Sequence, residues 1–181
     1  MKKVLLLTLV LMFSAGIAFA GPGSIGIFAD NAATSCNLPD VAPFGSYYII
    51  HVNQTGSSAC RYAAPKPACF TGAFFADQNP FPVTVGSSQT GVSVGYGSCL
   101  VGNVLTQTMV FFTSGTTPLC CYWTVVPDPL APSGKIEAVD CFDQFWYPTG
   151  GQGIVKSAPH CNCNVPAEET TWGKVKAIFA E

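Results

Sequence analysis

Short apolar runs alternate with proline- and glycine-rich turns along most of the chain. Ser46–Asn53 is the clearest run, because it combines aromatic and β-branched residues, which favour strands. We predict further strands at Ile25–Ala29, Cys60–Ala63, Ala68–Ala76, Val83–Val85, Gly91–Gly97, Val104–Phe112, Cys121–Val126 and Lys135–Phe142, with Gly153–Lys156 as a short addition. About eight or nine strands at this spacing predict an all-β fold, either an antiparallel β-sandwich or a barrel.

Two of these runs predict a hairpin. Cys121–Val126 and Lys135–Phe142 are joined by a loop that is rich in proline. If the two runs pair, Cys120 or Cys121 lies opposite Cys141, and opposed residues in an antiparallel pair are within reach of a disulfide. We therefore predict that one of the two adjacent cysteines bonds to Cys141.

The first twenty residues have the pattern of a cleaved signal peptide. Lys2 and Lys3 precede an apolar stretch, and Ala18-Phe19-Ala20 follows it. The apolar stretch is too short for a membrane span, which needs roughly 20 residues. We predict that residues 1–20 are removed, that the mature form has no membrane span, and that residues 21–163 form one secreted domain with an extracellular, periplasmic or cell-surface location.

Residues 164–181 are predicted to be a linker followed by a short C-terminal helix or tail. Trp172, Val175 and Phe179 recur at helical spacing, after two threonines that can cap a helix. Isolated helices need about 12–15 residues to be stable, and this one has fewer. The tail therefore docks on its own domain, is bound by an external partner, or stays disordered.

All nine cysteines follow the predicted signal peptide. In an exported chain we expect disulfides, and the odd number leaves one thiol over. Cys60 and Cys69 flank the sequence Pro-Lys-Pro and are a second candidate pair, while the other pairings stay open. The cysteines that we assign to disulfides are Cys60, Cys69, Cys120, Cys121, Cys141, Cys161 and Cys163.

The small number of charged residues limits the kinds of partner that we expect this protein to bind. Charged residues make up 10% of the chain, compared with about 25–35% of a typical soluble surface. Without Lys2 and Lys3 the chain has six basic and ten acidic residues, which argues against nucleic acid and anionic membranes. An uncharged surface of this size favours self-association or a protein partner, although a soluble exterior rich in glycine, serine and threonine explains it equally well.

Several segments carry a resemblance to a family. They are HVNQTGSSACRYAAPKPACFTG, TPLCCYWTVVPDPLAPSGKIEAVDC, GGQGIVKSAPHCNC and VPAEETTWGKVKAIF. Together they resemble uncharacterised secreted bacterial proteins, in which a cysteine-rich immunoglobulin-like β-sandwich ends in a Thr-Trp-Gly-x-x-Lys tail. The resemblance implies secretion and an immunoglobulin-like sandwich cross-linked by disulfides. It implies no activity.

One aromatic segment is a candidate ligand site. Phe145, Trp146 and Tyr147 follow Phe142 closely and precede a Pro-Thr-Gly-Gly turn. Exposed aromatic residues on a β-sandwich can stack on sugar rings or anchor a protein partner. Packing inside the core is the competing interpretation.

A second cluster, His160-Cys161-Asn162-Cys163, has the donor types that bind zinc or copper. Because disulfides compete for the same thiols in an oxidising compartment, we predict that Cys161 and Cys163 are cross-linked and that no metal or cofactor binds. His51 is expected to be a half-exposed strand residue, and no Gly-x-Ser-x-Gly elbow accompanies it.

The sequence therefore predicts a secreted, non-catalytic protein with a structural or interaction role, which assembles with itself, attaches to a surface or binds a protein. Two alternatives remain open. One is a carbohydrate- or protein-binding module that uses Phe142–Tyr147. The other is a metal or redox protein that uses His160, Cys161 and Cys163.

Overall fold

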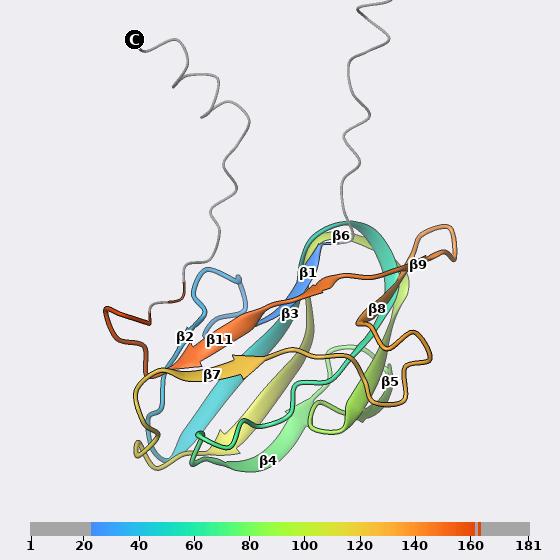
Figure 1. Cartoon of the computed structure of the whole chain (residues 1–181). Helices are drawn as coiled ribbons and strands as arrows, with labels where there is room; N and C mark the ends of the chain where they lie inside the picture. The colour runs from blue at the N-terminus through green and yellow to red at the C-terminus, as the bar shows by residue number, and fades with distance from the viewer. Residues whose placement is uncertain (1–22, 162, 164–181) are drawn as a thin grey trace, which may run out of the picture.

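A computed structural model describes residues 23–161 and residue 163 (Figure 1). These residues form eleven strands in two sheets and no helix. The strands are β1 (Ser24–Phe28), β2 (Asn37–Leu38), β3 (Phe44–Tyr62), β4 (Ala73–Gln78), β5 (Val83–Ser87), β6 (Gly91–Phe112), β7 (Cys121–Thr124), β8 (Glu137–Asp140), β9 (Phe145–Trp146), β10 (Thr149–Gly150) and β11 (Gln152–Val155). The predicted signal peptide and the predicted C-terminal helix with Trp172, Val175 and Phe179 lie outside the described residues. No helix in the described part of the chain is long and apolar enough to cross a membrane.

The large sheet is built on two long antiparallel strands, β3 and β6. In one half of the sheet the order is β10, β1, β3, β6 and β4. In the other half β5 pairs with β6, while β8 pairs with β3 and carries β9 on its far side. The small sheet has the order β2, β11, β7. Each half of the large sheet therefore offers a different outer surface.

The long strands replace four shorter strands of the prediction. The predicted runs that begin at Ser46 and Cys60 both lie in β3, and those that begin at Gly91 and Val104 both lie in β6. Turn-forming residues between the runs do not end the strands. At these residues the register of the β3–β6 pair shifts, and the pairing continues beyond them. Such irregularities bend a strand and increase its twist. Both strands therefore curve through the sheet and gain new neighbours beyond the bend (Figure 1).

Strand directions also differ from the predicted antiparallel arrangement. β10 runs parallel to β1, and β11 runs parallel to β2. β10 is a short strand at the edge of the large sheet, and β2 is a short strand at the edge of the small sheet, in which β11 is the central strand. The sheets are consequently mixed in direction.

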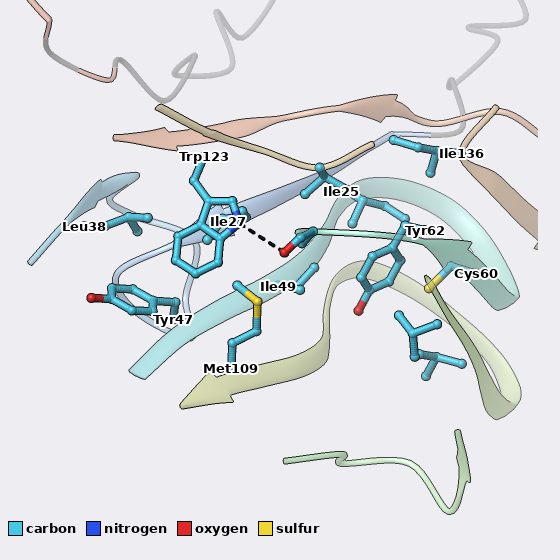
Figure 2. Packing of buried hydrophobic residues seen from close by; sticks show 14 of the residues in the cluster. Ile25, Ile27, Leu38, Tyr47, Ile49, Cys60, Tyr62, Met109, Trp123 and Ile136 are labelled. Carbon is cyan, nitrogen blue, oxygen red and sulfur yellow. Dashed lines mark hydrogen bonds between the residues drawn. The ribbon is translucent and has the colours of Figure 1, made fainter. Parts of the chain in front are cut away.

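The two sheets share one hydrophobic core. Trp123 of β7 is fully buried against Tyr47, Phe70 and Phe111, with ring centroids 5.1–5.4 Å from its own. Its indole N–H donates a hydrogen bond to the carbonyl of Ala64 at 3.1 Å (Figure 2). Alternate residues of each strand point inward. On the opposite face of the large sheet, Phe28 and Ile50 are buried in a second, smaller cluster with Ala33 and Cys36.

The predicted hairpin of residues 121–126 and 135–142 does not form. β7 pairs with β11 in the small sheet, with Trp123 opposite Gly153, whereas β8 pairs with β3 in the large sheet. The connection between them crosses from one sheet to the other, since Val126 bridges to Ala63 and Asp128 is held by Arg61. Burial of Trp123 in one layer and of Ala138 in the other favours this crossing over a local turn.

Each of the four disulfides joins cysteines that are at least 41 positions apart in the sequence. They join Cys36 to Cys163, Cys69 to Cys121, Cys99 to Cys141 and Cys120 to Cys161. The predicted bonds between Cys60 and Cys69, and between Cys141 and one of the two adjacent cysteines, are therefore corrected. Cys60 is a buried free thiol, because it points into the core between the sheets.

Candidate binding trough

The outer face of the second half of the large sheet carries the candidate site. Five strands contribute one residue each to a row, and the cross-strand register defines that row as Val83, Gly95, Ala59, Val139 and Phe145. A second row on the same face contains Val85, Ser93, Arg61 and Glu137. Neighbours along each strand, such as Cys60, Val94 and Ala138, face the core instead.

These rows form a trough because small and large residues are unevenly distributed across the strands. Ala59, Gly95 and Ser93 lie in the middle and rise little above the backbone. Val83 and Val85 of β5 form one exposed apolar wall, and Phe145 and Tyr147 form the opposite wall. The space between them has a volume of about 640 Å³. We call this feature the outer trough.

One end of the outer trough is closed by the segment that links β7 to β8. Pro132 and Ser133 of this segment line the trough. The segment is held by Asp128, whose carboxylate accepts a hydrogen bond from Arg61 Nε at 2.7 Å and one from the Leu130 N–H at 2.7 Å. Arg61 thereby connects the trough floor to its end wall.

The charges at this end compensate one another. Arg61 Nη1 also lies 4.0 Å from Glu137 Oε2. Burial alone would raise the pKa of the Asp128 carboxyl, but the hydrogen bonds from Arg61 and Leu130 and the charge of Arg61 outweigh it and lower that pKa below its ordinary value of 3.8. The end of the trough is therefore polar and locally fixed, whereas its walls are apolar.

The three predicted ligand-binding aromatic residues divide between two faces. Phe145 and Tyr147 line the outer trough, while Trp146 is half-buried and does not. The strand alternation explains this, since adjacent residues point to opposite sides. Lys135 Nζ lies 4.6 Å from the centroid of the Tyr147 ring. Phe142 is exposed at the β8–β9 turn and lies outside the trough lining.

Sequence reasoning missed the other wall and the floor. Val83 and Val85 lie more than 50 residues before Phe145, and only their common pairing with the β3–β6 centre brings them to the same surface. The alternation within the sequence Val83-Thr84-Val85 indicated a strand with one apolar face. It gave no signal that this face is directed away from the core.

The histidine and thiol nearest to this region are not available for catalysis at the surface. His51 is fully buried, not half-exposed as predicted, and its Nδ1 lies 3.1 Å from the Tyr96 hydroxyl. Burial raises the pKa of the Cys60 thiol to about 12, so this group stays protonated at neutral pH. Among the described residues that line the trough, Arg61 and Glu137 carry the charges, and they face each other. The trough is consequently suited to binding.

The predicted cluster of His160, Cys161 and Cys163 is divided. Cys163 is bonded to Cys36, and Cys161 is bonded to Cys120. His160 Nε2 lies 3.2 Å from Cys120 Sγ, so the sulfur that contacts the histidine belongs to the residue just before β7.

Comparisons with known proteins give one structural similarity and no family match. No protein-family model matches it, and no curated protein is significantly similar to it. Among solved structures, it is similar to the seventh type I cohesin of ScaB from Pseudobacteroides cellulosolvens, with 12% sequence identity and a TM-score of 0.44, covering 80% of this chain and 96% of that chain. A similarity of this size leaves function to be argued from the chain's own residues.

Proposed function

We propose that this protein is an exported, non-catalytic interaction module, and that the outer trough binds an apolar segment of a protein partner. We further propose that its two layers constitute an immunoglobulin-like sandwich. Four disulfides support export, because disulfides persist in oxidising compartments outside the cytosol.

The observation that carries the proposal is the exposure of the two apolar walls. Val85 is 71% exposed and Phe145 is 63% exposed, although both project from regular strands beside small floor residues. Large apolar side chains gathered around a hollow are characteristic of a binding surface. Binding a partner would remove these walls from water, which stabilises a complex by about 25 cal/mol per Å² of apolar area buried.

The composition of the trough favours protein side chains over sugars. A sugar needs several hydrogen-bonding groups placed around a stacking ring, whereas both walls and most of the floor here are apolar. The volume of about 640 Å³ lies within the roughly 300–1,000 Å³ of typical ligand pockets. It accommodates a few large side chains of a partner.

Carbohydrate binding remains the second candidate, and one observation favours it. Phe145 and Tyr147 present exposed rings on one wall, and Lys135 lies against Tyr147. A glycan would contact this wall, the Ser93 hydroxyl of the floor and the Ser133 hydroxyl of the end segment without needing Val85. Substitution of Val85 therefore separates the two candidates.

The proposal is tested with two matched pairs of variants. Val85→Ser and Phe145→Ser remove wall residues, while Val101→Ser and Phe142→Ser remove comparably exposed residues outside the trough, 68% and 83% exposed respectively. Peptides are selected from a random displayed library against the unchanged protein. We expect peptides with aromatic or aliphatic anchors, whose affinity falls about tenfold or more in each wall variant and stays unchanged in the controls.

Three other results would contradict this assignment. Selected peptides that bind all four variants equally would place the interaction elsewhere. Glycan binding that depends on Phe145 but not on Val85 would favour the carbohydrate candidate. Concentration-dependent dimerisation that Val85→Ser abolishes would make a second copy of the chain the occupant.

A further inference from the structure

A second cluster of chemical groups lies at the surface beside the start of β7. Cys120, His160 and Cys161 bring two sulfur atoms and one imidazole nitrogen within 4.8 Å of one another. The two cysteines are 41 positions apart in sequence and form a disulfide. His160 is exposed and Cys120 is half-buried, so reagents in solution reach this side of the bond.

Both ends of this disulfide lie next to a second disulfide. Cys121 adjoins Cys120 and is bonded to Cys69, while Cys163 lies two positions after Cys161 and is bonded to Cys36. In addition, the Cys120 N–H donates to the carbonyl of Lys156 at 3.0 Å. Opening the bond between Cys120 and Cys161 therefore leaves both segments held in place, with their sulfur atoms still close together.

The surroundings of the two sulfur atoms favour thiolates. The Ala158 N–H donates a hydrogen bond to Cys161 Sγ at 3.2 Å. A hydrogen bond of this kind stabilises negative charge on sulfur, both in a leaving group and in a metal ligand. His160 Nε2, 3.2 Å from Cys120 Sγ, supplies a nitrogen donor on the solvent side.

We propose that the Cys120–Cys161 disulfide is reducible in the folded protein, and that Cys120, His160 and Cys161 then bind one Zn²⁺ ion. Two thiolates and one imidazole match the ligand preference of zinc, and the exposed side leaves a fourth position for water. The sequence had grouped Cys163 with this histidine, whereas the fold replaces it with Cys120.

The reduction consumes two external thiols. The first attacks Cys120 Sγ as a thiolate, which breaks the protein disulfide, forms a mixed disulfide and releases Cys161 as a thiolate. The second attacks the mixed disulfide and releases Cys120, so that the external thiols leave as one disulfide and the protein has gained two electrons and two protons. Zn²⁺ then displaces both thiol protons.

The test uses the purified protein, a thiol reductant at increasing concentration and Zn²⁺ alone as the probe. Alkylation and peptide mass mapping identify which bonds open, and competition with a chromophoric chelator measures zinc affinity. We expect Cys120 and Cys161 to be alkylated while Cys69–Cys121 and Cys36–Cys163 stay closed. The reduced protein is expected to bind one Zn²⁺ per chain, and His160→Ala to weaken binding by more than about tenfold.

Two variants keep the result interpretable. His160→Ala leaves every cysteine in place and changes an exposed residue, so we expect it to fold as the unchanged protein does. Cys120→Ser with Cys161→Ser removes the site and should abolish zinc binding. Cys99→Ser with Cys141→Ser removes a distant disulfide and should leave zinc affinity unchanged. Equal zinc affinity of the reduced unchanged protein and of reduced His160→Ala would overturn the proposal. Opening of Cys120–Cys161 only together with the two flanking disulfides would also overturn it.

Discussion

At the scale of single residues, Asp128 has the clearest structural role. Its carboxylate joins Arg61 of β3 to the backbone of the segment that closes the outer trough. The space for it is provided by Gly91, where a Cβ would lie 2.5 Å from the Asp128 carboxylate and where φ is +128°. A side chain at position 91 would overlap the carboxylate and would strain the backbone. The position of the Asp128 carboxylate therefore depends on glycine at position 91.

The pKa of Asp128 gives a pH-dependent prediction. Because its folded-state pKa lies below the ordinary 3.8, the carboxylate stabilises the fold above its unfolded-state pKa, and this contribution is lost as pH falls through the folded-state pKa. Asp128→Asn should lower the free energy of unfolding at neutral pH by about 1–3 kcal/mol. Below about pH 4, the free energy of unfolding of this variant should fall less steeply with decreasing pH than that of the unchanged protein. Denaturant titrations from neutral to acidic pH check this, with Asp143→Asn as the exposed control. If the free energy of unfolding fell equally steeply at acidic pH in Asp128→Asn and in the unchanged protein, the role of this carboxylate would be contradicted.

At the scale of elements, the position of each strand depends on which layer its large residue enters. β7 has four residues, of which Cys121 and Trp123 are buried and the other two exposed. Trp123 fills the space between the small sheet and the centre of the large one (Figure 2). A strand this short contributes little by backbone pairing alone, so the buried indole and the Cys69–Cys121 disulfide together hold β7 in place.

Trp123 variants test this account. Trp123→Ala should lower the free energy of unfolding by about 3–5 kcal/mol, because it removes a fully buried ring. Trp123→Phe keeps an aromatic ring and loses the hydrogen bond to Ala64, whose carbonyl also accepts from Gln89, so a smaller loss of about 1–3 kcal/mol is expected. Thermal or denaturant unfolding measures both. Equal losses would show that the indole hydrogen bond, and not packing, positions β7.

At the scale of the whole molecule, Cys60 reports on global stability. It is the free cysteine of the described chain and lies in the core shared by both sheets. Only opening of the core exposes it, and its raised pKa leaves little thiolate at neutral pH.

We therefore expect a thiol reagent to label the native protein very slowly, without reductant, and to label one cysteine per chain after denaturation. The labelling rate in mild denaturant should follow the free energy of global unfolding, which Trp123→Ala lowers. Peptide mapping identifies the labelled residue. Fast labelling of Cys60 under native conditions would mean that the sheets separate locally.

Local sequence patterns were sufficient to locate most of the strands. Aromatic and β-branched runs placed the strands around Ile25, Tyr48, Val83, Val110 and Tyr122, because side-chain alternation and turn chemistry act over a few residues. The same local pattern singled out Phe145, Trp146 and Tyr147 together as a candidate ligand site, with packing inside the core as the competing interpretation.

Which strands become neighbours depends on long-range packing, which local patterns do not contain. The sequence favoured local pairs, such as β7 with β8 and Cys60 with Cys69, whereas the fold pairs β7 with β11 and bonds Cys69 to Cys121. Alternation of apolar and polar residues with a period of two indicates that successive side chains point to opposite faces of a sheet. It does not indicate what covers either face. Val83 faces Phe145 across the outer trough, and His160 lies against Cys120. Both contacts depend on the order of the strands, which follows from the burial of Trp123 and its neighbours between the two sheets. Burial between residues far apart in the sequence leaves no local pattern from which it could be predicted.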